Sequence, residues 1–389
     1  MKDEGLRSDR AADVAYFACV LGGIAFLVLF GAFAQRSALV HSNDFSGIWS
    51  GGRAIALGSD PYDRTSFPAL AERLGTQLPD SGVYGYPAWV ALAMVPLAWL
   101  PLEVASWSWT IATWLLALVA TRAALRAFLP RSPLAHALTG LAATISTPAY
   151  HQFVLGQWGF ALLAALFAGT IAIRNGHALR GAAALLALLA KPQLFLAAPI
   201  ALLATRRVAL YWFAGAAAIA LLSTLAMPWW WSAWLSAVPA GRLAQPATLY
   251  SLLRDLLGGA GIAVAVALAA VGVLLVLPLP RGSDAWRAGW LSLSLAFAPY
   301  EWAYDHYLLL APLVIAAAAV TKRSERAAIV VLGVGTGVLL FLSPVLYAVA
   351  IARSRETFSA IAPLLIFALI VGALWWARAA GDRAEVSAA

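Results

Sequence analysis

The sequence has few charged residues and almost no cysteine. Only 11% of its 389 residues are Asp, Glu, Lys or Arg, whereas 62% are hydrophobic. A soluble domain carries about 25% charged residues and about 45–50% apolar ones. The lone Cys19 excludes an intrachain disulfide and a cysteine metal cluster. The chain is therefore expected to be an integral membrane protein.

The basic surplus, a formal net charge of +8, does not indicate a nucleic-acid partner. The Lys and Arg residues are scattered in short loops between apolar runs, which is typical of positive-inside topology. The polar N-terminus precedes an apolar run that is too long for a signal peptide and has no A-x-A-like cleavage site. We interpret this run as a retained first span.

Long apolar runs recur along the chain, each long enough to cross roughly 30 Å of hydrocarbon as a helix. They lack the polar–apolar alternation of a membrane barrel. We expect an all-α fold in one polytopic membrane domain over residues 1–389, with about 12 transmembrane helices and both ends cytoplasmic. The clearer spans are residues 14–34, 104–125, 133–150, 157–173, 208–227, 260–280, 287–300, 306–320, 327–349 and 357–377.

Two segments are ambiguous. Residues 86–103 are interrupted by prolines and are short for a span, so they are expected to lie in the interface or to re-enter. Residues 178–205 form either a hairpin that turns at Lys191 and Pro192 or one kinked span with Lys191 snorkelling. The hairpin places nearly every basic loop on one side, and the positive-inside rule therefore favours it.

Two outer loops are sizeable. The first, residues 35–87, holds the polar stretch "HSNDFSGIWSGGRAIALGSDPYD". The second, residues 228–257, is rich in tryptophan, which suits the headgroup layer. Both loops are expected to carry helices that lie along the membrane surface.

A few carboxylates stand where a span meets an outer loop. Asp44 follows the first span, and Glu301 and Asp305 lie beside His306 between two apolar runs. Ionisable groups near membrane depth are costly and usually face a functional cavity. The structural alternative for Asp44 is an N-cap of the short helix that follows it, which would not exclude catalysis.

Other polar groups are expected on the same side. These are Asp60, Tyr62, Gln157 and Lys191, although Gln157 could equally belong to an ordinary turn. The five histidines show no metal-ligand spacing, and no Walker loop, dinucleotide fingerprint or nucleophile elbow is present. The sequence predicts neither a metal nor a cofactor. A cation surrounded by apolar residues would suit a lipid that carries a phosphate.

Five stretches in this order resemble glycosyltransferase family 87, the polyprenol-phosphate-mannose-dependent mannosyltransferases. They are "NDFSGIWSGGRAIALGSDPYD", "YGYPAWVALAMVPLAWLP", "LGQWGFALLAAL", "LLALLAKPQLFLAAP" and "YEWAYDHYLLLAPL". The resemblance covers roughly residues 40–350. Ala88 is a departure, because the family tends to have a second proline there.

The resemblance implies a C-type glycosyltransferase fold and inverting sugar transfer. It implies that Asp44 is the catalytic base and that His306 lies near the donor phosphate. The substrate-binding residues expected with them are His306, Lys191, Gln157, Tyr62, Glu301, Asp305 and Tyr86. The expected partners are a polyprenyl-phosphate sugar donor, a glycolipid or glycan acceptor and membrane lipids.

The predicted protein is therefore a cell-envelope glycosyltransferase in the inner (plasma) membrane with its active site on the outer, periplasmic side. Mannose is the family's default sugar, and a pentose is an alternative. A transporter or flippase for a lipid-linked glycan is the second hypothesis, although the matched broken helices common in transporters are not found in the sequence. A purely structural assembly subunit is the third.

Overall fold

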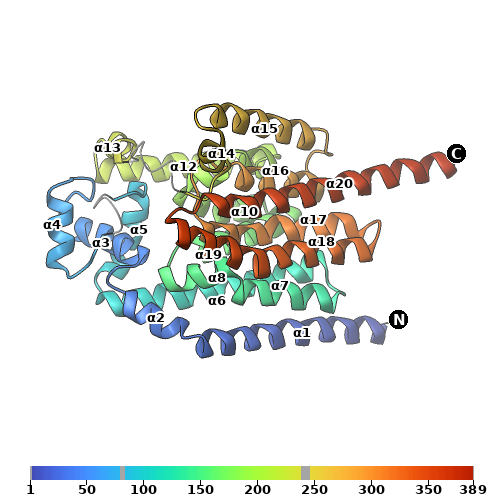
Figure 1. The fold of residues 1–389 in the computed structure, drawn as a ribbon, viewed down its shortest axis with the longest axis horizontal. Helices are drawn as coiled ribbons and strands as arrows, with labels where there is room; N and C mark the ends of the chain where they lie inside the picture. Colours follow the sequence, from blue (N-terminus) through green and yellow to red (C-terminus); the bar gives the residue numbers. More distant parts are fainter. Residues whose placement is uncertain (1, 79–83, 238–245, 389) are drawn as a thin grey trace.

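The computed structural model describes residues 2–78, 84–237 and 246–388. Helices make up most of the described part of the chain, which contains no β-strand. The molecule is elongated, and both termini lie at one end, which we call the terminal end (Figure 1). The opposite end, the loop end, holds α3 (Asp44–Ala56), α4 (Ser66–Arg73) and α13 (Trp230–Ala237).

Six helical segments of the described chain are long and apolar enough to cross a membrane. They are Asp9–Leu29, Leu102–Phe128, Arg206–Ala226, Ala303–Thr321, Glu325–Arg353 and Thr357–Ala380. A seventh is a bent pair, α8 (Thr147–Leu155) and α9 (Gly159–Arg174), whose axes meet at 117°. Shorter apolar helices add to these, and the expected number of about 12 stays a prediction.

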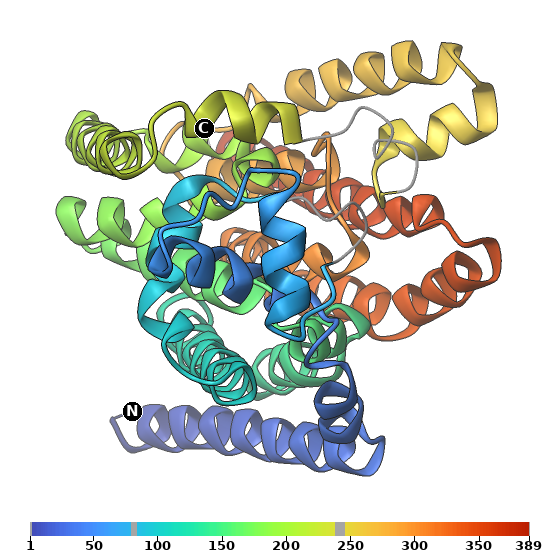
Figure 2. The same cartoon turned by 90° about the vertical axis from the view of Figure 1, so that its left-hand side faces the viewer.

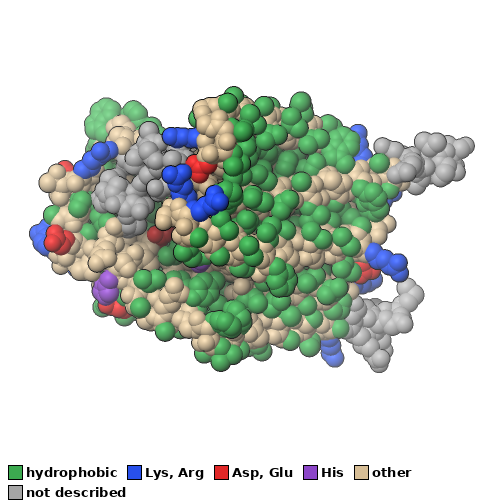
Figure 3. All heavy atoms as spheres, viewed as in Figure 1, with side chains coloured by type: hydrophobic (Ala, Val, Ile, Leu, Met, Phe, Trp, Pro, Cys, Tyr) green, Lys and Arg blue, Asp and Glu red, His purple; other side chains and the backbone are tan. Residues whose placement is uncertain are grey.

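The outer surface between the two ends is hydrophobic. Figure 3 shows hydrophobic side chains over the middle of the molecule and charged side chains mainly towards its two ends. Leu21, Leu115, Leu225 and Leu274 are all more than half exposed along this surface. In water this would be an aggregation hazard, whereas lipid accommodates it. The chain is a multi-pass membrane protein.

Several helices differ from the expected spans. The first span, predicted at 14–34, belongs to α1 (Lys2–Leu29), and Gly31 with φ 71° then breaks the chain before α2 (Ala32–Leu39). The span predicted at 133–150 is divided into α7 (Pro133–Ile145) and α8, because Pro148 lacks a helical donor and Ser146 caps the new helix.

The helices at the remaining predicted spans follow the predicted order with shifted ends. They are α6 (Leu102–Phe128), α12 (Arg206–Ala226), α15 (Ala260–Val276), α16 (Asp284–Ala296), η4 (Ala303–Leu309) with α17 (Leu310–Thr321), α18 (Glu325–Gly337) with η5 (Val338–Leu342) and α19 (Ser343–Arg353), and η6 (Thr357–Ala360) with α20 (Ile361–Ala388). The 3₁₀ segment η4 begins the span that α17 continues, and the π segment η5 lies between α18 and α19 within one span.

The segment 86–103 does not form a full-length span. Its first helix, α5 (Ala88–Ala98), has 11 residues, and about 20 are needed to cross a bilayer. Pro101 then precedes α6. The length of this helix is therefore compatible with the interfacial or re-entrant path expected for the segment, which stays a prediction.

The segment 178–205 reverses direction, as the hairpin interpretation predicted. It consists of α10 (Ala178–Leu185), η1 (Leu186–Ala190), η2 (Pro192–Phe195) and α11 (Ala198–Leu202). Along α16, Ser294 Oγ donates to the Leu194 carbonyl at 3.0 Å, and Trp286 Nε1 donates to the Ile200 carbonyl at 3.3 Å. The second arm of the hairpin therefore runs antiparallel to α16.

The outer loops carry short helices at the loop end, which faces the viewer in Figure 2. The first loop contains α3 and α4, and residues 79–83 of this loop lie outside the described chain. The second contains α13 and α14 (Leu249–Leu257), and residues 238–245 between them lie outside it too. The helices expected in both loops are thus present, while their position relative to a membrane surface stays a prediction.

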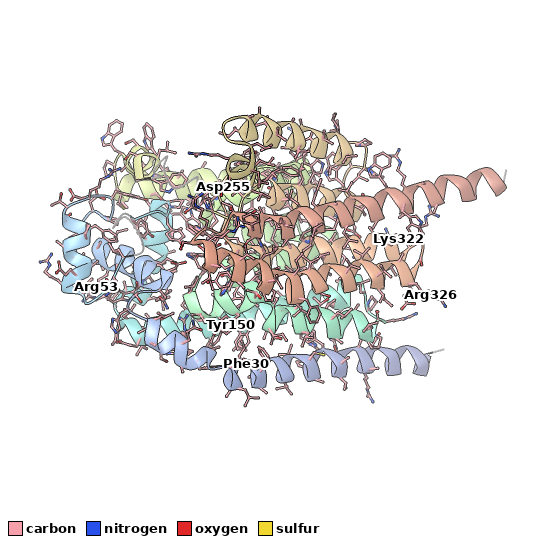
Figure 4. All side chains as sticks on the ribbon, in the orientation of Figure 1. Phe30, Arg53, Tyr150, Asp255, Lys322 and Arg326 are labelled. Atoms are coloured by element: carbon pink, nitrogen blue, oxygen red, sulfur yellow. The ribbon has the colours of Figure 1, made fainter. Side chains whose placement is uncertain are left out.

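The charge distribution supports one orientation. Lys322 and Arg326 lie towards the terminal end, and Arg53 lies at the loop end (Figure 4). Arg122 and Arg126 both pair with Asp13 near the start of the first span. The positive-inside rule would make this terminal end cytoplasmic.

We expect cysteine labelling in intact cells to reveal this orientation. In a Cys19→Ala background, Thr65→Cys in the first loop should react with a membrane-impermeant maleimide, because the Thr65 side chain is exposed at the loop end. Lys322→Cys, also exposed, should react only after permeabilisation. The reverse pattern would show that the loop end faces the cytoplasm.

Candidate active site

A polar cavity of about 280 Å³ lies between the outer loops and the helical bundle. Its walls include Asp44, Tyr86, Gln157, Lys191, Tyr304 and Asp305. These residues come from five segments that are far apart in the sequence. The structure thus brings together five of the eight residues that the sequence analysis proposed, and Tyr304 joins them.

Asp44 is the first residue of α3. The alternative that Asp44 caps this helix does not hold, because Asn43 occupies the N-cap and its Oδ1 accepts from the Ser46 amide at 3.2 Å. The side-chain Nδ2 of Asn43 donates to the Val154 carbonyl at 3.2 Å. Asn43 therefore accepts a hydrogen bond from a backbone amide of the first helical turn, and the Asp44 carboxylate is directed towards the cavity. The first helical turn is also a favourable place for a negative charge.

Gln157 holds the Asp44 carboxylate. Its Nε2 donates to Asp44 Oδ2 at 2.5 Å and to the Tyr304 hydroxyl at 3.3 Å. Its Oε1 accepts from the Tyr86 hydroxyl at 3.0 Å. Gln157 is buried at the bend between α8 and α9, where Gly156 adopts φ 69°. These contacts favour the functional interpretation of Gln157 over that of an ordinary turn.

Arg36 supports the bend between α8 and α9, and the sequence analysis did not propose it as a site residue. It is fully buried, and its guanidinium donates to the carbonyls of Phe153 and Val154 and to the carbonyl and hydroxyl of Ser106. A Cβ at Gly156 would lie 3.2 Å from both terminal guanidinium nitrogens. The only sequence signal was an arginine close behind the first apolar run.

Lys191 and Asp305 form a buried ion pair at the hairpin turn. Lys191 Nζ lies 2.7 Å from Asp305 Oδ1, and the side chains are 5% and 2% exposed. The ammonium also lies 4.6 Å from the centre of the Tyr304 ring. The second oxygen of Asp305 accepts from the Trp302 amide at 3.2 Å. An ammonium has three donors, and Asp305 accepts from one of them, so the pair can still bind an anion in the cavity.

Glu301 and His306 are buried but do not line this cavity. Glu301 Oε1 lies 3.8 Å from His306 Nε2, which is too long for a hydrogen bond, and neither atom has another partner within the described chain. Burial, and then the charge of Asp305, raise the pKa of Glu301 well above its usual range. The role of His306 near a phosphate stays a prediction.

Tyr62 also lies outside the walls of this cavity. Its hydroxyl donates to the Tyr86 carbonyl at 2.6 Å, so it supports Tyr86 from behind. Burial and the nearby Asp60 carboxylate raise the pKa of Tyr62 above its usual range. Tyr62 is therefore a neutral hydrogen-bond donor.

Glu356 was not identified in the sequence either. Its Oε2 accepts from the Ala303 amide at 2.8 Å, at the start of η4. Burial raises the pKa of Glu356 to about 7, and the charges of Asp305 and Asp44 add to the increase while the Ala303 bond opposes it. Within the described residues, no group of three or more His, Cys, Asp or Glu side chains is placed to hold a metal ion.

The fold and the cavity define a multi-pass membrane protein with a carboxylate and a cation facing one polar space. The chain belongs to glycosyltransferase family 87, whose sequence pattern matches residues 84–298, more than half of its length. The protein is therefore a membrane glycosyltransferase. The match includes Tyr86, Gln157 and Lys191, whereas Asp44 and Asp305 lie outside it. Searches of curated proteins and of solved structures gave no match.

Breaking the buried ion pair should destabilise the protein. Lys191→Met leaves the Asp305 carboxylate buried without its counter-charge, which typically costs about 3–5 kcal/mol. The double variant with Asp305→Asn should recover much of the loss, because no unpaired charge remains. The thermal midpoint of purified protein, followed by tryptophan fluorescence, measures both.

Arg355→Met is the matched control for this comparison. It breaks the exposed Arg355–Asp255 pair, whose atoms are 3.4 Å apart, and exposed pairs contribute only about 0–1 kcal/mol. Equal shifts for Lys191→Met and Arg355→Met would contradict the stabilising role of the buried pair.

The Glu356 carboxyl should make stability depend on pH. Its pKa is raised from 4.5 to about 7 in the folded protein, so the folded state binds the proton more tightly and this contribution to stability is lost as pH rises from about 5 to about 7. Glu356→Gln keeps an acceptor for the Ala303 amide but removes the titration. Between pH 5 and pH 8, the free energy of unfolding of this variant should rise by up to about 3 kcal/mol relative to that of the unaltered protein.

Thermal midpoints of both proteins measured across this pH range test the prediction. A constant difference between them would show that Glu356 does not titrate in this window.

Proposed function

We propose that this glycosyltransferase moves a hexose, with mannose as the expected sugar, from a polyprenyl-phosphate donor to a hydroxyl of a lipid- or glycan-linked acceptor. Transfer takes place with inversion on the outer, periplasmic face of the inner membrane, on a C-type glycosyltransferase fold. The observation that supports this most is that Asp44 and Lys191 face the same cavity at the loop end.

Asp44 is the proposed general base. As the acceptor oxygen attacks the anomeric carbon, its proton passes to the Asp44 carboxylate, and the bond between that carbon and the phosphate oxygen breaks. The bonding electrons leave with the phosphate. A positioned base of this kind contributes about 10²–10⁴-fold to the rate.

Gln157 and Tyr86 position this base. The hydrogen bond from Gln157 to Asp44 Oδ2 orients the carboxylate, and Tyr86 fixes the amide of Gln157 in turn. A supporting chain of this kind holds a catalytic group in one productive geometry.

Lys191 is the proposed stabiliser of the leaving phosphate. A cation directed at developing negative charge stabilises it strongly in a site that excludes water. Asp305 fixes the position of the ammonium. The donor's lipid chain would remain in the hydrocarbon while its phosphate meets Lys191 at the edge of the bilayer.

A transporter or flippase is less well supported than an enzyme, because the chain belongs to a glycosyltransferase family. The two functions differ in their products. A transferase releases free polyprenyl phosphate from a lipid-linked sugar, whereas a flippase leaves the molecule intact. Purified protein incubated with polyprenyl-phosphate mannose, glucose and arabinose in turn, followed by mass analysis, identifies the donor and separates the two functions.

Asp44→Asn should abolish transfer without unfolding the protein. The amide has nearly the same shape but does not accept the proton, so the rate should fall by at least about 100-fold. Transfer is measured by the release of polyprenyl phosphate in membranes, and folding by the thermal midpoint.

Asp63→Asn is the control for a carboxylate in the same loop. Asp63 is exposed and accepts from the backbone amides of Thr65 and Ser66, which an asparagine oxygen also does. This variant should turn over normally. Normal turnover by Asp44→Asn would remove Asp44 from the mechanism.

A further inference from the structure

A second cavity lies at the loop end, outside the site described above. Its volume is about 500 Å³, and it is formed where the first outer loop meets the start of the second. Ser59, Asp60 and Tyr62 line it from one side, and Trp229, Trp230 and Ser232 line it from the other. The cavity thus combines aromatic rings, hydroxyl groups and a carboxylate.

The helix α13 and Tyr62 separate the two cavities. Trp230 and Ala233 face the second cavity, whereas Trp234 lines the first and donates from Nε1 to the Gly85 carbonyl at 3.0 Å. On the other side, Tyr62 lines the second cavity while its hydroxyl holds Tyr86, which lines the first. The two cavities therefore share a wall formed by α13 and by the contact of Tyr62 with Tyr86.

The wall is held by contacts within the first loop and between the two loops. Arg64 donates to the Ser236 carbonyl at the end of α13 at 2.7 Å. The Tyr62 and Tyr84 rings meet edge to face with centres 5.7 Å apart, and Trp230 packs against the small apolar cluster that contains both of them. The second cavity is therefore a feature of the folded protein rather than a gap between loose loops.

Trp229 has an unusual conformation. Its φ is 67°, in the left-handed region that side chains other than glycine rarely adopt, and the residue is 71% exposed. Backbone strain of this kind persists where the surrounding structure enforces it, and it clusters at ligand sites. Here the Trp229 carbonyl accepts from the Ser232 amide at 3.1 Å, which starts the turn into α13.

Asp60 supplies the charged group. One oxygen of its carboxylate accepts from the Tyr62 amide at 2.9 Å, and a carboxylate has acceptor positions for several more donors. The side chain is exposed at the cavity. A carboxylate repels phosphate but accepts strongly from hydroxyl groups.

We propose that the second cavity binds the carbohydrate part of the acceptor. A pyranose has apolar C–H faces that suit the Trp229 and Trp230 rings, and hydroxyls that suit Asp60, Ser59 and Ser232. The inference rests on the proposed function, because the acceptor's reactive hydroxyl must reach Asp44 while the rest of the molecule needs another surface. The cavity on the far side of the shared wall provides that surface at the same end of the molecule.

Direct binding tests the site without turnover. Fluorescently labelled short oligosaccharides of mannose, glucose, galactose and arabinose are titrated into protein in nanodiscs. At least one should bind, and Trp229→Ala and Asp60→Asn should each weaken its binding by at least about tenfold, as expected for a residue that dominates a contact.

Trp99→Ala and Asp63→Asn are the matched controls. Trp99 is an exposed tryptophan at the end of α5, and Asp63 is an exposed carboxylate of the first outer loop, yet neither lines the second cavity. Both should leave binding unchanged. Weakening by all four substitutions, or retention of binding by Trp229→Ala and Asp60→Asn, would overturn the proposal. So would binding of none of the oligosaccharides, or of anionic lipid vesicles instead.

Kinetics separate this inference from the proposed function. With a donor and acceptor that react, Trp229→Ala should raise the KM for the acceptor and leave the KM for the donor unchanged. An unchanged acceptor KM, with transfer still abolished by Asp44→Asn, would overturn the second site alone. Oligosaccharide binding that depends on Trp229 and Asp60, with no donor ever consumed, would overturn the transferase and support the carbohydrate site.

Discussion

The buried ion pair between Lys191 and Asp305 is the interaction on which the arrangement of the cavity depends. Desolvating two charges costs several kcal/mol for each ion, so each residue requires the other. Lys191 stands where the hairpin reverses, and Asp305 stands in the 3₁₀ segment that begins the span Ala303–Thr321. Irregular backbone at membrane depth is tolerated where it is buried in protein or lines a cavity. The pair therefore holds two irregular segments against each other and forms one wall of the site.

A second polar cluster forms the opposite wall. Arg36 donates to backbone carbonyls at the end of α8 and so fixes the bend that carries Gln157, which holds Asp44. Tyr304 connects the two walls, because its hydroxyl accepts from Gln157 while the Lys191 ammonium lies over its ring. The proposed base and the proposed phosphate-binding cation are thus positioned through one shared residue. The outer loops close the site above, and α13 separates it from the second cavity.

Much of the fold followed from composition and apolar run length. The order of the helices, the loop helices and the reversal at Lys191 were predictable because lipid demands long apolar helices and because Pro192 and a lysine do not fit a simple span. The breaks after Leu29 and Ile145 were missed, since Gly31 and Pro148 stand within apolar runs that look continuous. In the candidate site, Asp44, Gln157, Lys191, Asp305 and Tyr86 converge as proposed, whereas Tyr62, Glu301 and His306 do not line the cavity.

The sequence by itself determined that the chain lies in a membrane, which polar groups stand at the ends of its spans, and which family it resembles. These properties depend on residue type and on spacing along the chain. Tertiary structure alone decided that Asn43 rather than Asp44 caps α3, that Arg36 and Glu356 support the site, and that Asp60 and Trp229 share a second cavity. Most of these groups are far apart in the sequence, by 117 positions for Arg36 and Phe153 and by 53 for Ala303 and Glu356, and their geometry exists only once the helices have packed.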